Sequence, residues 1–163
     1  MDQERDGAGR AAGPPGRAAA PGRAAGPPGH LEVPVGGLGE LNDRLGIEII
    51  DWTPDRMVAT MPVQGNRQPY GLLHGGASCA LAEMLGSTAA ALAGGPGRFP
   101  VGVEINATHH RSARAGTVTA VCTPLHTGSS LATFQIAITD EGGRRVCTAR
   151  LTCVYLHTRP VSA

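Results

Sequence analysis

The chain has 163 residues, which fits a single domain with a core of ordinary size. Its 14 basic and 13 acidic residues nearly cancel, so the composition gives no support to a general nucleic-acid-binding surface. The four cysteines are well separated and form no C-x-x-C pair, which indicates neither a zinc site nor a disulfide framework, and no stretch near the N-terminus is typical of a signal peptide. We therefore expect a cytoplasmic protein with reduced thiols.

The first 35 residues are dominated by Ala, Gly, Pro and Arg, and the string RAAGPPG occurs in them twice. Such a composition cannot bury enough apolar surface to fold, so we predict a disordered tail over 1–35. One domain is then expected over 36–157, followed by a short C-terminal tail over 158–163.

Several shorter elements are predicted around one long helix. A short helix is expected over 38–45, and a turn at 53–55 separates strand-like segments at 46–52 and 56–63, which indicates a hairpin. The polar loop 64–70 contains Pro69 and leads into the long helix. After a Gly-Pro-Gly stop, strands are predicted over 101–110, 117–125, 131–139 and 145–155, and the turn D-E-G-G joins the last two.

The segment from Leu72 to Ala93 is apolar or small throughout, contains no proline and carries Glu83 as its only charge. This pattern predicts one core helix that is buried nearly all round, because the uncharged stretches on either side of Glu83 are too short for a membrane span. The helix projects two different faces. Small residues accompany Glu83 on one face, namely Gly76, Cys79, Ala80, Gly86, Ser87 and Ala90, and larger residues occupy the other, namely Leu81, Met84, Leu85, Thr88 and Leu92.

About five long strands and one buried helix favour an α+β fold in which a curved antiparallel sheet wraps around the central helix. The expected order is a hairpin, the long helix and an antiparallel meander. This is the hotdog arrangement.

The first turn of the long helix offers backbone N–H groups that lack partners, and Gly75 and Gly76 leave them accessible to a carbonyl oxygen or an oxyanion. The alternative is that these glycines serve only close helix packing. A carboxylate among apolar neighbours, as at Glu83, suits a general base or a nucleophile. The alternative is a salt bridge from Glu83 to an arginine of a neighbouring strand.

Further polar residues surround these two groups. His74 and Gln68 flank the predicted helix start and are placed to orient an acyl carbonyl, although a lone histidine is more often structural. Ser87 lies one turn after Glu83 and is placed to orient the carboxylate or a water molecule. The alternative is that the Ser87 hydroxyl bonds the carbonyl four residues earlier.

An anionic ligand is favoured by the middle of the chain, where Glu83 and Glu104 are the only acids between residues 56 and 139. Loop tips in this region combine cations, hydroxyl groups and free amides, which suit phosphates. These positions are His109, Arg111 and Arg114 after the first strand that follows the helix, and Gly128 and Ser129 in the next turn.

The strings NRQPYGLLHGGASCALAEMLGS, VGVEINATHHRSA and PLHTGS resemble the hotdog-fold thioesterases that act on aromatic acyl-CoA thioesters. The resemblance covers about 46–156 and is closest to the dihydroxynaphthoyl-CoA and enterobactin-proofreading thioesterases, with hydroxybenzoyl-CoA thioesterases as further members. It implies hydrolysis of an acyl-CoA or acyl-carrier-protein thioester without metal or cofactor. A homodimer that assembles into a homotetramer is expected, with neither a nucleic-acid nor a membrane partner.

The resemblance also implies roles for individual positions. Glu83 matches the catalytic carboxylate, and Gly75 matches the amide that binds the thioester oxygen. Gln68 and His74 match the polar groups beside that amide, and Ser87 matches the residue that assists the carboxylate or the water. His109 matches a histidine near the acyl pocket, whereas His110 occupies a place that is often apolar.

Two other functions remain open. A hotdog hydratase or dehydratase would act on a β-hydroxyacyl thioester with a histidine and a carboxylate. A binding module would hold acyl-CoA without turning it over, although the presence of Glu83 argues against this function.

Overall fold

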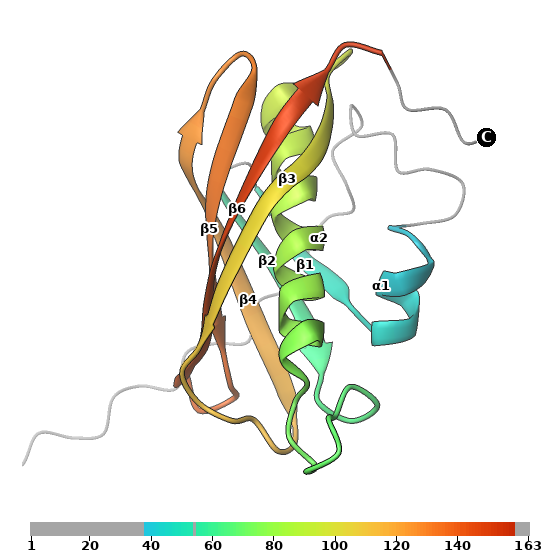
Figure 1. Cartoon of the computed structure of the whole chain (residues 1–163), viewed down its shortest axis with the longest axis vertical. Helices are drawn as coiled ribbons and strands as arrows, with labels where there is room; N and C mark the ends of the chain where they lie inside the picture. The colour runs from blue at the N-terminus through green and yellow to red at the C-terminus, as the bar shows by residue number, and fades with distance from the viewer. Residues whose placement is uncertain (1–37, 54, 159–163) are drawn as a thin grey trace, which may run out of the picture.

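The computed structural model describes residues 38–53 and 55–158 (Figure 1). The disordered tail predicted for 1–35 lies outside these residues, as does most of the predicted C-terminal tail. Two helices and six strands follow in the order α1 (Glu40–Leu45), β1 (Glu48–Thr53), β2 (Arg56–Pro62), α2 (Gly75–Gly94), β3 (Phe99–His109), β4 (Thr117–Thr127), β5 (Leu131–Thr139) and β6 (Arg145–Leu156).

The strands form one antiparallel sheet in the order β1-β2-β4-β5-β6-β3, with α2 lying along one face (Figure 1). The sequence predicted the central helix and the antiparallel sheet correctly, but its four-strand meander after the helix is wrong. Only β4, β5 and β6 form a meander, because β2 takes the place beside β4 and β3 lies at the far edge beside β6. The connection after β3 then crosses the end of the sheet to reach β4.

Helix α2 begins at Gly75, next to His74 as predicted, and three residues after the start of the apolar run at Leu72. The two leucines before it belong to the preceding loop, since the Leu72 carbonyl accepts from the Gln68 N–H and the Leu73 N–H donates to the Ala113 carbonyl. These bonds hold the backbone away from a helical path. His74 becomes the N-cap and fixes where the helix can begin.

The sheet supplies the core that covers α2. Cys147, Ala149, Leu151, Cys153 and Tyr155 alternate along β6 and are buried, as the period of two predicted. Near the C-terminal end of the helix, the buried Tyr155 hydroxyl donates to the Ala90 carbonyl over 3.0 Å. Although α2 is long and apolar enough to cross a membrane by length and composition, it is the core helix of this sheet.

Helix α2 is nevertheless not buried all round. Leu81 and Leu85 on the predicted large face are fully buried, whereas Glu83 and Ser87 on the small face are half-buried. The division into faces was inaccurate at Gly86 and Ala90, which are buried. Gly86 faces the sheet, since a Cβ there would lie 2.6 Å from the Leu151 Cδ2. The open side of the helix therefore carries the carboxylate.

Candidate active site

The N-terminus of α2 presents one free backbone donor. The His74 ring accepts from the Gly76 N–H through Nδ1 over 2.8 Å, so this ring caps the helix. The Gly75 N–H has no acceptor in the part of the chain that the structure describes. Because helix N-termini carry partial positive charge, this amide is suited to bind a carbonyl oxygen or an oxyanion.

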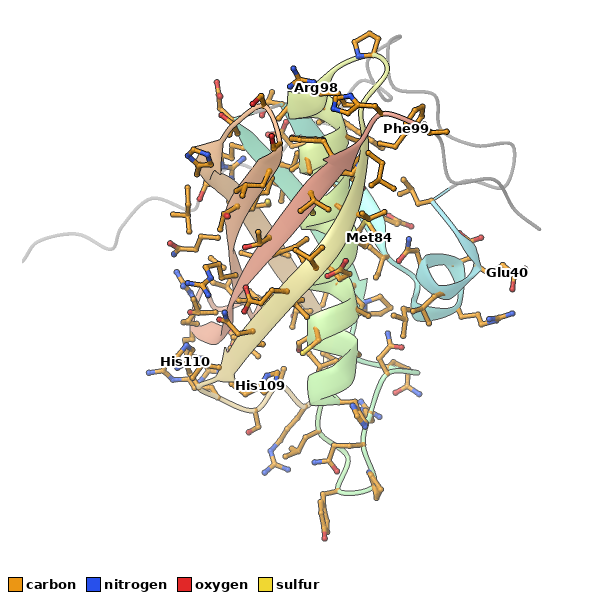
Figure 2. The ribbon with its side chains drawn as sticks, turned by 45° about the horizontal axis from the view of Figure 1, so that its top comes forward. Glu40, Met84, Arg98, Phe99, His109 and His110 are labelled. Carbon is orange, nitrogen blue, oxygen red and sulfur yellow. The ribbon has the colours of Figure 1, made fainter. Side chains whose placement is uncertain are left out.

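His109 adjoins the same N–H group. A Cβ added at Gly75 would lie 2.9 Å from the His109 Nε2, so the ring at the end of β3 lies against the first turn of α2. His110 points to the other face of the sheet, where its Nε2 lies 3.0 Å from the Thr148 hydroxyl. Figure 2 shows His109 beside the helix and His110 farther from it. Because successive side chains along a strand point to opposite faces, His110 lies on the face of the sheet that is turned away from α2.

Glu83 lies in the middle of α2 and takes part in none of the ion pairs formed by the described residues. The alternative of a salt bridge from Glu83 to an arginine is therefore wrong for one subunit. Ser87 donates to the Glu83 carboxylate over 3.3 Å and lies 3.9 Å from the Cys153 sulfur. The bond to the carbonyl four residues earlier is made by the next residue instead, since the Thr88 hydroxyl donates to the Met84 carbonyl over 2.8 Å.

The Cys153 thiol lies beneath this pair of residues. Burial raises its pKa, the Ser87 hydrogen bond lowers it, and the Glu83 charge raises it further. The first of these effects is the largest, so Cys153 remains a neutral thiol and adds no second negative charge beside the carboxylate.

Glu83 and Ser87 open onto a groove of about 440 Å³ between α1 and α2. Figure 2 shows Met84 on the side of α2 that faces α1, where Glu40 is labelled. The remaining lining residues are Leu38, Gly39, Leu41, Asn42, Ala80 and Thr88. The walls are mainly apolar, and the Glu83 carboxylate is the group best placed for chemistry. The sequence analysis did not predict that α1 lines the groove. The signal for it in the sequence is weak, namely the exposed Leu41 near Leu38.

Gln68 is tied to its own loop, because its side-chain oxygen accepts from the Tyr70 N–H. The loop itself is anchored by the buried Asn66, a residue that the sequence analysis missed. Its side chain donates to the carbonyls of Leu45 and Pro62, and its backbone carbonyl accepts from the His74 N–H. An asparagine in a polar loop carries no pattern from which this role could be predicted.

The predicted phosphate-binding residues do not form one cluster within a subunit. Arg111 and Arg114 follow β3 near the N-terminus of α2, and Arg111 donates to the Arg145 carbonyl over 3.2 Å. Gly128 and Ser129 lie in the β4–β5 turn at the opposite end, where the next residue, Ser130, bonds Tyr155 of β6.

Arg114 also has acidic neighbours that the charge pattern did not predict. It lines a polar hollow of about 510 Å³ together with Asp140, Glu141 and Arg144. The Arg144 side chain holds the pKa of Asp140 below its usual value. The folded chain thus places two acids beside an arginine that the sequence analysis assigned to an anionic ligand.

Comparison with known proteins links this geometry to a family. Residues 70–147 match a family model described as the thioesterase superfamily. The proofreading thioesterase EntH of Cronobacter turicensis is 51% identical over 120 residues, which are 73% of this chain and 88% of that protein.

Solved structures give the same relationship. A thioesterase from Haemophilus influenzae is 44% identical with a TM-score of 0.69, over 71% of this chain and 82% of that one. A mutant thioesterase from Pseudomonas aeruginosa is 40% identical with a TM-score of 0.69, over 71% of this chain and 85% of that one.

Proposed function

Because the chain belongs to the thioesterase superfamily and is a thiolester hydrolase with the hotdog fold, we propose that its substrate is an acyl thioester of CoA or an acyl carrier protein. The acyl group is aromatic. The observation that carries this proposal is the free Gly75 amide on the same helix as the Glu83 carboxylate, which opens onto a largely apolar groove. An apolar slot with few polar groups suits an aryl acyl chain.

Two groups of α2 perform the reaction. The Gly75 N–H binds the thioester oxygen and stabilises the negative charge that develops on it. Glu83 either attacks the thioester carbon directly or takes a proton from the attacking water. In direct attack the carbon–sulfur bond breaks as the acyl group moves to Glu83, and water then hydrolyses the resulting anhydride to regenerate the carboxylate. In the water route the carbon–sulfur bond breaks after water adds to the carbon. The leaving thiolate takes up a proton in both routes, and the products are the thiol and the carboxylic acid. Ser87 donates to the carboxylate and holds its orientation.

The other predicted residues bind and orient the substrate. His74 caps the helix so that the Gly75 amide stays free, and Gln68 shapes the loop beside it. His109 borders the acyl group next to Gly75. Arg111 and Arg114 bind phosphates at this end of the subunit, while Gly128 and Ser129 do so from the other end.

Helix geometry supports a site that is shared between two subunits. Gly75 and Glu83 are eight residues apart, hence about 12 Å along the axis. A nucleophile must approach the bound carbon to about 3 Å, so one subunit cannot supply both groups. A twofold dimer with antiparallel central helices brings Glu83 of one chain to Gly75 of the other.

The exposed edge of the sheet offers a surface for such a dimer. Strand β3 pairs with β6 on one side only, and most of its residues are exposed. Two dimers then associate into a homotetramer in the cytoplasm. The distance argument and the open edge support the dimer, and the tetramer is the expectation from the resemblance to hotdog thioesterases.

A thiol-release assay over aryl and aliphatic CoA esters tests the function, with Glu83→Ala as the inactive comparison. We expect aryl esters to have the highest kcat/KM and Glu83→Ala to fold normally and lose hydrolysis. Near-normal turnover by the folded variant would remove Glu83 from the mechanism. Addition of water to crotonyl-CoA without thiol release would favour the hydratase, and binding of CoA esters without turnover would favour the binding module.

A further inference from the structure

The Glu83 carboxylate rests on the backbone of strand β3 at a single glycine. An ideal Cβ built at Gly102 would overlap the Glu83 Oε1, and it would lie 3.1 Å from Cδ and 3.3 Å from Oε2. These three atoms are the nearest that the Cβ would meet, and all belong to the carboxylate. Gly102 therefore leaves open the space that the carboxylate occupies.

The backbone conformation does not explain this glycine. The turn before β3 contains Gly95 and Gly97 with φ of 70° and 76°, where a glycine is favoured. Gly102 has no such positive φ, and it lies inside β3, where glycine weakens a strand relative to alanine. The close approach of the Glu83 carboxylate gives a direct steric reason for a glycine here.

The sheet around Gly102 supports the same conclusion. Gly102 pairs with Cys153, whose sulfur lies near Ser87, and the register of β3 shifts between Gly102 and Glu104. A bulge of this kind next to a reactive group redirects the strand and its side chains. Gly102 and Ser87 thus both contact the Glu83 carboxylate, and Cys153 lies beside each of them.

We propose that Gly102 is a positioning residue for Glu83: its missing side chain fixes the place of the carboxylate relative to the thioester carbon. This inference rests on the proposed role of Glu83. A methyl group at residue 102 must push the carboxylate away, because the three atoms nearest to it all belong to the end of the Glu83 side chain. A displacement of about 1 Å costs on the order of 100-fold in rate.

The test compares Gly102→Ala with Gly142→Ala in the full chain. Gly142 lies in the exposed β5–β6 turn, and a Cβ there would meet its nearest atom, Asp140 Oδ1, at 3.3 Å. We expect Gly102→Ala to lower kcat about 100-fold while KM and Tm stay close to those of the wild type. Gly142→Ala should leave all three unchanged.

A double variant separates positioning from general damage. Glu83→Asp shortens the side chain by one methylene, so its carboxylate no longer reaches the space that the methyl group of Gly102→Ala fills. The two changes together should therefore be no slower than Glu83→Asp alone, as measured by single-turnover thiol release. Multiplying losses, a lowered Tm or a raised KM in Gly102→Ala would overturn the inference. So would an unchanged kcat in Gly102→Ala when Glu83→Ala is inactive, whereas an active Glu83→Ala would overturn the proposed function itself.

Discussion

The Ser87 hydroxyl and the Glu83 carboxylate lie 3.3 Å apart on successive turns of α2. This spacing follows from helix geometry, since side chains four residues apart share a face. The hydroxyl has turned away from the backbone and toward the carboxylate. The contact ties the orientation of the reactive group to a side chain that bears no charge.

Replacing this hydroxyl should slow the reaction without preventing substrate binding. We expect Ser87→Ala to lower kcat about tenfold, since a hydrogen bond to a charged group contributes on the order of 1.5 kcal/mol. Ser87→Thr keeps the hydroxyl and should retain more activity than Ser87→Ala. Steady-state thiol release checks both variants. Equal kcat in Ser87→Ala and the wild type would show that the hydrogen bond has no part in catalysis.

Mixing two inactive variants should restore activity if the site is shared. Glu83→Ala removes the carboxylate, and Gly75→Pro removes the backbone N–H at the first position of the helix, where proline is tolerated. After subunit exchange, half of the dimers are mixed and each has one intact site, so about a quarter of wild-type activity is expected. Gly75→Ala is the matched control, because it crowds His109 but keeps the N–H. Parents that remain inactive after verified exchange would exclude a shared site.

Removal of the arginines after β3 should weaken binding more than turnover. Arg111→Ala and Arg114→Ala are each expected to raise KM for CoA esters by up to about fivefold, since an exposed charge contact contributes up to about 1 kcal/mol. The effect should shrink as salt is added, because screening weakens exposed charge contacts. Arg56→Ala serves as a control, since Arg56 pairs with Asp51 on the other edge of the sheet. A change confined to kcat would place the two arginines outside phosphate binding.

Buried thiols should make the fold less stable at high pH. Burial raises the pKa of Cys122 from 9.0 to about 12 and that of Cys147 to about 11. Above pH 9 the unfolded chain therefore loses thiol protons that the folded chain keeps, so stability that is complete below this pH falls as pH rises. Each thiol contributes a slope of about 1.4 kcal/mol per pH unit until its folded pKa is reached.

Urea unfolding between about pH 8 and pH 11 measures this slope. Cys122→Ala should reduce it by the contribution of one thiol. Ile136→Val is the control. Ile136 lies opposite Cys122 on the neighbouring strand, so this change weakens the packing there without removing an ionisable group. Parallel slopes for Cys122→Ala and the wild type would contradict the prediction.

The sequence predicted the parts of this fold that depend on local patterns. The apolar run that became α2 and the alternation in β6 were both recognised from their periods. The position of β3 in the sheet was not predicted. Its pairing with β6 depends on where α2 ends in space and not on the composition of the strand. The helix start beside His74 was predicted, but the exclusion of Leu72 and Leu73 from the helix follows from a long-range contact, since Leu73 is held by the distant Ala113.

In the candidate site, too, features that depend on local patterns were predicted and features that depend on distant contacts were not. The contact between Ser87 and Glu83 was predicted because both lie on one helix, where spacing fixes direction. The contacts of Asn66 and Gly102 were missed, because they are made with residues far away in the chain. The contribution of α1 to the groove is also a tertiary effect, as no local pattern shows which helix a short amphipathic segment will face.

The open edge of β3 has a consequence for how the protein is made. A newly folded subunit exposes a row of unpaired backbone groups along the eleven residues of β3, and such an edge is a template for uncontrolled aggregation. The bulge near Gly102 interrupts that row, and irregular edges resist wrong pairing. The irregularity beside the Glu83 carboxylate thus also protects the open edge of a single subunit from wrong pairing.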